Sequence, residues 1–136
     1  HGAAYADEMI ATSRAFAAAL DAAGIPVYGK EQGFTRSHQF AVEAAPFGGG
    51  QTASKKLRKA GFLACGIGLP IAPVEGDLNG LRIGTPELVR WGVTRENVGE
   101  IAALVARALT TNDPESLAAE TRALRAQYQD LHFVTR

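Results

Sequence analysis

The chain has 136 residues, of which 46% are hydrophobic and 21% are charged, values typical of one globular domain. Its 14 basic and 14 acidic residues cancel, so the composition gives no support to a nucleic-acid-binding protein or a membrane-surface protein. No apolar run has the length of a membrane-spanning helix, and we therefore expect neither nucleic-acid nor membrane partners.

The first predicted element is a long helix over residues 3–23, a segment rich in alanine and other strong helix formers. Four large side chains recur in it at helical spacing: Tyr5, Met9, Phe16 and Leu20. Gly24 follows at the place where a helix C-terminus favours a residue that tolerates positive φ. Residues 25–28 then predict a short strand, and Pro26 assigns this strand to a sheet edge.

The alternation in "HQFAVE" predicts a second strand over residues 38–43. Three of its side chains share one face: His38, Phe40 and Val42. The segment "PFGGG" over residues 46–50 is interpreted as a flexible loop, because its glycines lack the Lys-Ser/Thr that completes a phosphate-binding loop. A short helix is predicted over residues 53–60, with Thr52 as its cap and Gly61 ending it.

Another strand is predicted over residues 62–65, followed by a loop over residues 66–79 that is rich in glycine and proline. The next strand is predicted over residues 80–84. Residues 85–87, "TPE", then form a strong helix start, with a capping hydroxyl, a proline at the first helical position and a carboxylate near the positive end of the helix dipole.

Two further helices are predicted after this start. The first begins at Thr94 and carries one apolar face: Val98, Ile101, Ala102, Val105 and Leu109. The second begins at Asp113 and carries another apolar stripe: Leu117, Leu124, Tyr128 and Leu131. Hairpin-like neighbouring strands, with helices on one side, indicate an α+β fold in which a small, mostly antiparallel sheet is covered by helices.

Cys65 is the single cysteine, so no internal disulfide can form and we expect a cytoplasmic protein. Its position at a strand end is more typical of a small buried residue than of a reactive thiol. The three histidines are widely separated, and together with Cys65 they show no metal-ligand spacing: His1, His38 and His132.

Arg82 is the residue that most needs a partner, because a charge inside the apolar strand "GLRIG" requires compensation. One interpretation is an internal ion pair with an acidic residue nearby: Glu75, Asp77 or Glu87. The other is an anion-binding role, since a guanidinium can donate two parallel hydrogen bonds to a carboxylate. The local sequence leaves both interpretations open.

The segment "GLRIGTPELVRWGVT", residues 80–94, resembles a motif of the C-terminal small domain of serine hydroxymethyltransferases. These are pyridoxal-phosphate enzymes of the aspartate aminotransferase-like fold. The similarity runs through most of the chain, because "RAFAAALDAAGIPV", "TRSHQFAVEA" and "TASKKLRKAGFLACGIGLP" are similar to the family's preceding segments. The helix segments are weak signals alone, whereas "GLRIGTP" after such a strand and helix is fairly specific.

The resemblance implies a division of the chain and two site residues. Residues 1–24 would be an interdomain helix and residues 25–136 the small domain. Arg82 would bind the α-carboxylate of an amino-acid substrate, and His38 would either line the site or be a hydrogen-bonded core histidine. Pyridoxal phosphate would be bound mainly by a large domain that is absent from this chain and lies in the same protein or a companion chain. The family's dimers imply a homodimer.

Three departures from the family pattern stand out. The lysines of the chain are Lys30, Lys55, Lys56 and Lys59, and none of them lies in the family's "THKT" context. We therefore expect no catalytic residue in this chain and no activity of the chain by itself. Ile67 replaces an asparagine that touches folate in the family, which argues against tetrahydrofolate because isoleucine cannot form the amide's hydrogen bonds. Trp91 replaces the arginine before the glycine of the family's "TtRG".

From these features we expect part of a pyridoxal-phosphate enzyme that makes or breaks the Cα–Cβ bond of a β-hydroxy-amino acid, of the serine–glycine interconversion type in one-carbon metabolism. One alternative is a folate-independent enzyme of the threonine aldolase or transaldolase type. A second alternative is a non-catalytic α+β interaction domain in which Arg82 belongs to a structural ion pair.

Overall fold

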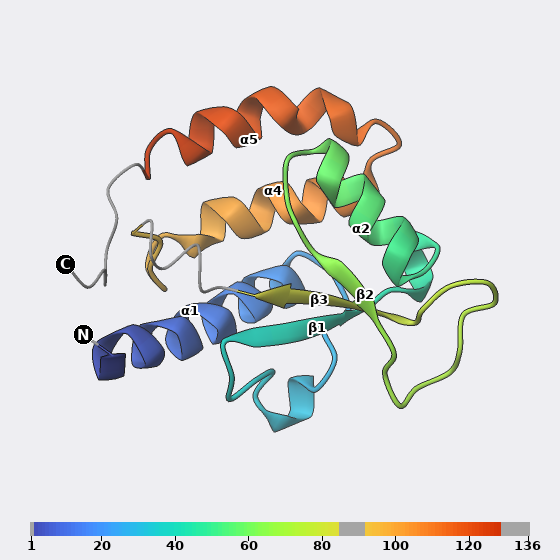
Figure 1. The fold of residues 1–136 in the computed structure, drawn as a ribbon, viewed down its shortest axis with the longest axis horizontal. Helices are drawn as coiled ribbons and strands as arrows, with labels where there is room; N and C mark the ends of the chain where they lie inside the picture. The colour runs from blue at the N-terminus through green and yellow to red at the C-terminus, as the bar shows by residue number, and fades with distance from the viewer. Residues whose placement is uncertain (1, 85–91, 129–136) are drawn as a thin grey trace.

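A computed structural model describes residues 2–84 and 92–128 of the chain. Its centre is a three-stranded antiparallel sheet in the order β1-β3-β2, which helices cover on one face (Figure 1). The central strand β3 (Gly80–Gly84) lies between β1 (Gln39–Glu43) and β2 (Cys65–Ile67). The predicted α+β class, with its small antiparallel sheet, is therefore confirmed.

Helix α1 (Gly2–Ala22) corresponds to the predicted first helix. Phe16 and Leu20 on its inner face are 1% and 0% exposed, so this face is part of the hydrophobic core. Gly24 ends the helix with φ of 88°, a left-handed conformation that glycine adopts without strain from a Cβ atom. The amide of Ile25 then donates to the carbonyl of Leu20 at 3.0 Å, which closes the end of the helix.

The predicted strand over residues 25–28 is reduced to one antiparallel bridge between Val27 and Val42. Two backbone hydrogen bonds flank the bridge, one from Tyr28 to Ala41 at 2.9 Å and one from Glu43 to Pro26 at 2.8 Å. The segment thus lies along the outer edge of β1, where the missing amide of proline leaves no gap inside a ladder. On β1 itself, Phe40 and Val42 are buried, as the alternation predicted.

Helix α2 (Gly50–Lys59) begins three residues earlier than predicted, and the "PFGGG" segment is packed rather than a flexible loop. A 3-10 turn (Ala45–Phe47) precedes the glycines. A Cβ atom at Gly50 would overlap the carbonyl oxygen of Gly80, and one at Gly49 would collide with the carboxyl group of Asp77. The glycines are therefore required by close packing against the segment that leads into β3.

The long loop before β3 is held by Asn79, whose side chain is 8% exposed. Its carboxamide oxygen accepts from the amide of Leu69 at 2.6 Å. Its amide nitrogen donates to the carbonyls of Leu69, Ile71 and Ala72 at 2.9, 3.1 and 3.3 Å. This one side chain replaces the backbone pairing that a strand would have supplied. The preceding strand β2 begins at Cys65, so the predicted strand over residues 62–65 is displaced toward the C-terminus.

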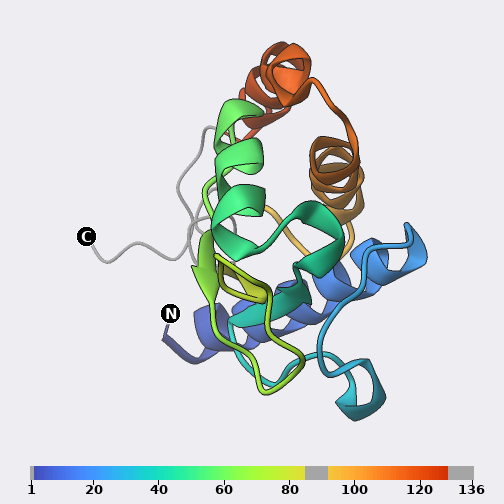
Figure 2. The same cartoon turned by 90° about the vertical axis from the view of Figure 1, so that its right-hand side faces the viewer.

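Helix α4 (Val98–Thr110) lies beside α1, and both run along the helical face of the sheet (Figures 1 and 2). All five residues of its predicted apolar face are buried: Val98, Ile101, Ala102, Val105 and Leu109. The helix begins four residues after Thr94, whose backbone amide is bonded instead to the side chain of Asn97 at 2.6 Å. Lys56 of α2 donates to the carbonyl of Leu109 at 3.0 Å and so links α2 to the end of α4.

The last helical segment consists of a 3-10 turn (Pro114–Leu117) and helix α5 (Ala118–Arg125), which lies above α4 and runs back along it (Figure 1). Leu117 and Leu124 are buried, as predicted, and Tyr128 is packed against the core. The predicted helix start at residues 85–87 and the residue Leu131 lie outside the described residues.

Candidate functional site

Helices cover one face of the sheet, and none of the described α-helices covers the other, which we call the open face (Figure 1). Arg82 lies on the open face. Strand alternation explains this, because Leu81 and Ile83 on either side of Arg82 are 0% and 5% exposed and point into the core. Arg82 pairs in register with Ala41 of β1 and Cys65 of β2, so these three side chains share one face. The charge that seemed misplaced in an apolar strand is therefore directed to solvent.

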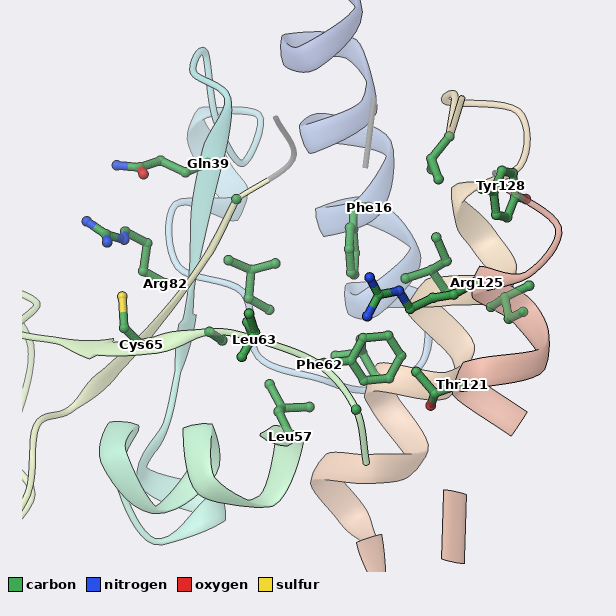
Figure 3. Close-up of a pocket in the computed structure, with 18 of the residues that line it drawn as sticks. Phe16, Gln39, Leu57, Phe62, Leu63, Cys65, Arg82, Thr121, Arg125 and Tyr128 are labelled. Carbon is green, nitrogen blue, oxygen red and sulfur yellow. The ribbon is translucent and has the colours of Figure 1, made fainter. Parts of the chain in front are cut away.

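Figure 3 shows how the open face is arranged. The side chains of Gln39, Arg82 and Cys65 project to one side of the sheet, and those of Phe16, Leu57 and Phe62 lie on the other. Gln39 pairs with Gly84, which is the residue two positions beyond Arg82 on β3. Gln39 and Arg82 are thus diagonal neighbours on adjacent strands, at a spacing that long side chains can bridge.

The guanidinium of Arg82 has no hydrogen bond or ion pair with any residue that the structure describes, and its side chain is exposed. Asp77, one of the predicted ion-pair partners, uses its carboxylate elsewhere, at the start of α2. Glu75 makes no ion pair within residues 2–84 and 92–128, and Glu87 lies outside them. The structural ion pair is therefore not found with Glu75 or Asp77, and no acidic residue among those described pairs with the guanidinium.

His38, the second predicted site residue, lies immediately before β1. The residue is exposed, so it does not lie in the core, and a role in lining the site stays a prediction. It lines a cavity of about 1020 Å³ that opens beside the helical layer, and Arg82 lines the same cavity. The two residues thus border one hollow, although strand alternation assigns their side chains to opposite faces of the sheet.

A second, smaller hollow of about 250 Å³ lies on the open face. Its walls come from β1, from Ile67 of β2 and from the segment between residues 28 and 37. Gln39 and Arg82 line both hollows, and they are the two residues that do so among those described. These side chains therefore form the boundary between the two spaces. Sequence reasoning did not single out Gln39, because its position next to Arg82 depends on strand register.

The segment that walls the smaller hollow is held firmly against the rest of the chain. Phe34 has φ of 71°, an uncommon left-handed conformation for an aromatic residue. Arg14 of α1 donates to the carbonyl of Thr35 through two nitrogens at 3.3 and 3.2 Å. The Thr35 hydroxyl in turn donates to the carbonyl of Gln39 at 2.6 Å. These bonds fix the backbone immediately after Phe34 and connect it to the start of β1.

The start of α2 is the feature most similar to a phosphate site, and Asp77 already occupies it. The backbone amides of Gln51 and Thr52 donate to its carboxylate at 2.9 and 3.0 Å, and the Thr52 hydroxyl donates at 2.8 Å. The bond from Gln51, followed by that from Thr52, lowers the pKa of Asp77 from 3.8 to about 2. A cofactor phosphate therefore does not fit here, because an ionised carboxylate holds the donors.

The lysines of the chain are also not placed to hold a cofactor beside Arg82. Lys30 pairs with Asp21 at 3.1 Å, Lys56 binds the end of α4, and Lys59 lies 3.8 Å from Glu115. Neither these residues nor Lys55 line either hollow beside Arg82. Within residues 2–84 and 92–128, no group of three His, Cys, Asp or Glu side chains could hold a metal ion. None of the helices in this part is long and apolar enough to cross a bilayer.

Comparisons with known proteins place the chain among relatives about three times its length. No protein-family model matches it. An alpha-methylserine aldolase from Variovorax paradoxus is 55% identical over 136 residues, which are 100% of this chain and 31% of that protein. A serine hydroxymethyltransferase from Pyrobaculum arsenaticum is 33% identical over 132 residues, which are 97% of this chain and 31% of that protein.

The fold has a counterpart among solved structures. The crystal structure of an L-threonine transaldolase from Pseudomonas fluorescens matches with a TM-score of 0.78 over 92% of this chain and 28% of that chain, at 21% sequence identity. At that identity the likeness concerns the fold. The chain thus spans 31% of the length of the curated relatives it matches. It belongs with the serine hydroxymethyltransferase-like proteins and fits a C-terminal segment of such an enzyme.

Proposed function

We propose that this chain is the substrate-carboxylate-binding domain of a pyridoxal-phosphate enzyme that makes or breaks the Cα–Cβ bond of a β-hydroxy-amino acid. The observation that carries the proposal is the guanidinium of Arg82, exposed on the open face of the sheet and without a partner among the described residues. A planar guanidinium binds a carboxylate through two parallel hydrogen bonds, which fix both the position and the orientation of an amino acid.

The cofactor would be held outside this chain, because neither the lysines nor the start of α2 fit it. When bound, pyridoxal phosphate supplies an electron sink for the bond that breaks at the α-carbon. The part that we assign to Arg82 is to hold the carboxylate so that this bond is correctly oriented. Rigid placement supports that role, since Arg82 projects from the central strand of the sheet and is paired on both sides.

Within this class we favour a folate-independent aldolase over a hydroxymethyltransferase. Ile67 lies on the same sheet face as Arg82, two residues beyond Cys65, and lines the smaller hollow. Its side chain offers no hydrogen bond to a pteridine or other polar ring. The 55% identity to an alpha-methylserine aldolase also favours this reaction. We therefore propose α-methylserine as a substrate of the whole protein.

The reaction type is tested by aldehyde release from α-methylserine and from serine, with and without tetrahydrofolate. We expect aldehyde release that tetrahydrofolate does not accelerate. A strict requirement for tetrahydrofolate would instead support the hydroxymethyltransferase. The absence of bond cleavage in both assays, together with no visible absorbance from bound pyridoxal phosphate, would favour the non-catalytic interaction domain.

The role of Arg82 is tested in the full-length protein with Arg82→Lys and Arg82→Ala. We expect kcat/KM to fall by an amount equivalent to about 2–4 kcal/mol in either variant, because lysine retains the charge but not the planar pair of donors. A kcat/KM equal to that of the unaltered protein in both variants would refute the assignment. Arg58→Lys on the exposed surface of α2 serves as the matched control.

We also propose the arrangement of the whole protein. Residues 1–24 would connect the small domain to the large cofactor-binding domain, and two copies would form a cytoplasmic homodimer. Light scattering on the full-length protein tests the dimer, which a monomeric mass would contradict. Limited proteolysis near residue 24 tests the boundary, because an interdomain connection is cut more readily than a packed core.

A further inference from the structure

Gln39 has the position of a second ligand for the anion that Arg82 binds. Both side chains project from the open face of the sheet, on adjacent strands and in diagonal register (Figure 3). Gln39 is half-buried, and its carboxamide makes no hydrogen bond with the residues that the structure describes. Two polar groups without partners, one charged and one neutral, therefore lie next to each other on a rigid sheet.

The first hollow extends beside these two groups, and Gly84, the residue that pairs with Gln39, lines it together with both of them. A side chain at that position would stand on the same face as Arg82 and Gln39. Its absence leaves room for a ligand between the two polar groups and the first hollow, which Gly84 also lines. On the other side, Ala41 is the small residue that pairs with Arg82. Between β1 and β3, each of the two long polar side chains thus lies opposite a small residue, Gln39 opposite Gly84 and Arg82 opposite Ala41.

We infer that Gln39 donates a hydrogen bond from its carboxamide to the substrate carboxylate that Arg82 holds. The inference rests on the proposed function of Arg82 and adds a specificity-determining residue to that site. An arginine can use two of its donors on a carboxylate, which leaves lone pairs on both carboxylate oxygens for a further donor. A neutral amide fits this place, since a carboxylate side chain would instead pair with the guanidinium.

The carboxamide of Gln39 would recognise the carboxylate of the substrate rather than the rest of the amino acid. A hydrogen bond to a charged group is stronger than one between neutral groups. Its loss should therefore lower the preference for a carboxylate over a neutral carboxamide in the ligand. L-serine and L-serinamide differ by that one group, so the ratio of their affinities isolates the contact.

The test measures binding of L-serine and L-serinamide to the full-length protein from the change in cofactor absorbance, together with kcat/KM for L-serine. In Gln39→Leu we expect the Kd for L-serine to rise about tenfold or more, with the Kd for L-serinamide unchanged. In Gln39→Glu we expect a larger loss, because the new carboxylate occupies the guanidinium. Gln32→Leu, an exposed residue outside both hollows, is the matched control and should behave as the unaltered protein.

The outcomes separate this inference from the function on which it rests. If Arg82→Lys weakens L-serine binding while Gln39→Leu leaves the ratio of the two affinities unchanged, Gln39 is not a ligand and the role of Arg82 stands. If neither variant changes L-serine binding, both assignments are wrong. An equal weakening of L-serine and L-serinamide in Gln39→Leu would also overturn the inference, because it would indicate a general change in the sheet rather than a lost carboxylate contact.

Discussion

Replacing Asn79 by aspartate should loosen the loop between β2 and β3 while leaving the shape of the side chain almost unchanged. In the native protein the amide nitrogen of Asn79 donates to three carbonyl oxygens, at 2.9, 3.1 and 3.3 Å. In Asn79→Asp an oxygen replaces that nitrogen and faces the same three carbonyls. The bond from the amide of Leu69 to the other side-chain oxygen remains.

The size of the effect follows from the number of bonds lost. The two N–H groups of the amide serve the three carbonyls, so at about 1 kcal/mol per hydrogen bond their loss costs about 2 kcal/mol in local stability. Burial of an ionised carboxyl group adds to this loss at neutral pH. Hydrogen–deuterium exchange of the loop amides in the full-length protein measures it directly, and about 2 kcal/mol corresponds to exchange that is on the order of 30-fold faster.

The pH dependence gives this prediction a second check. Burial beside three carbonyls raises the pKa of the new carboxyl above its unfolded value, so the folded variant binds the proton more tightly. Stability lost at neutral pH should therefore be partly regained as the pH falls, when the protonated acid can donate one hydrogen bond. Protection factors, which divide out the intrinsic exchange rate at each pH, make the comparison. A protection factor in Asn79→Asp that matches the unaltered protein at pH 7, or that is larger at pH 7 than at pH 5, would refute the account of Asn79.

Two further predictions concern the junction between α2 and the loop. In Asp77→Asn we expect a lower Tm at pH 7, because the amides of Gln51 and Thr52 lose an ionised acceptor. Since the pKa of Asp77 is lowered from 3.8 to about 2, this stabilisation is present above pH 4 and is lost as the pH falls toward 2. The Tm difference between the two proteins should therefore shrink over that interval, and a constant difference would contradict the proposed cap. In Gly50→Ala, the new Cβ would overlap the carbonyl of Gly80, so we expect destabilisation of about 1–3 kcal/mol in urea unfolding. The exposed Gly99→Ala, where a Cβ meets no atom within 4 Å, is the control, and equal stability of the two variants would rule out the close contact.

Arg82 illustrates what local sequence can establish about a site. Its setting in "GLRIG" predicted a strand with one charged side chain, and the alternation of buried neighbours confirms it. Whether that charge meets an internal acid depended on where the acids lie. Asp77 is nearby in sequence but binds the start of α2, so proximity along the chain does not make it a partner of Arg82.

Gln39 illustrates the opposite case, because nothing in its own segment distinguishes it from a solvated surface residue. Its relation to Arg82 arises from antiparallel register between strands that are about 40 residues apart in the chain. The same is true of Gly50, which read as part of a flexible loop and is in fact in contact with Gly80. Such contacts are set by the paths of distant segments, which periodicity does not describe.

The sequence by itself determined the helices, the alternation of β1 and β3, the α+β class and the candidate role of Arg82. The helices, the alternation and the fold class follow from spacing and turn chemistry, which act over a few residues, whereas the role of Arg82 is what the family resemblance implies. The tertiary structure decided which face of the sheet is open and that His38 is exposed. It also decided that Asp77 fills the start of α2 and that Gln39 adjoins Arg82. Each of these depends on packing between segments far apart in the chain, and the physical reason is that register and burial are properties of the assembled sheet.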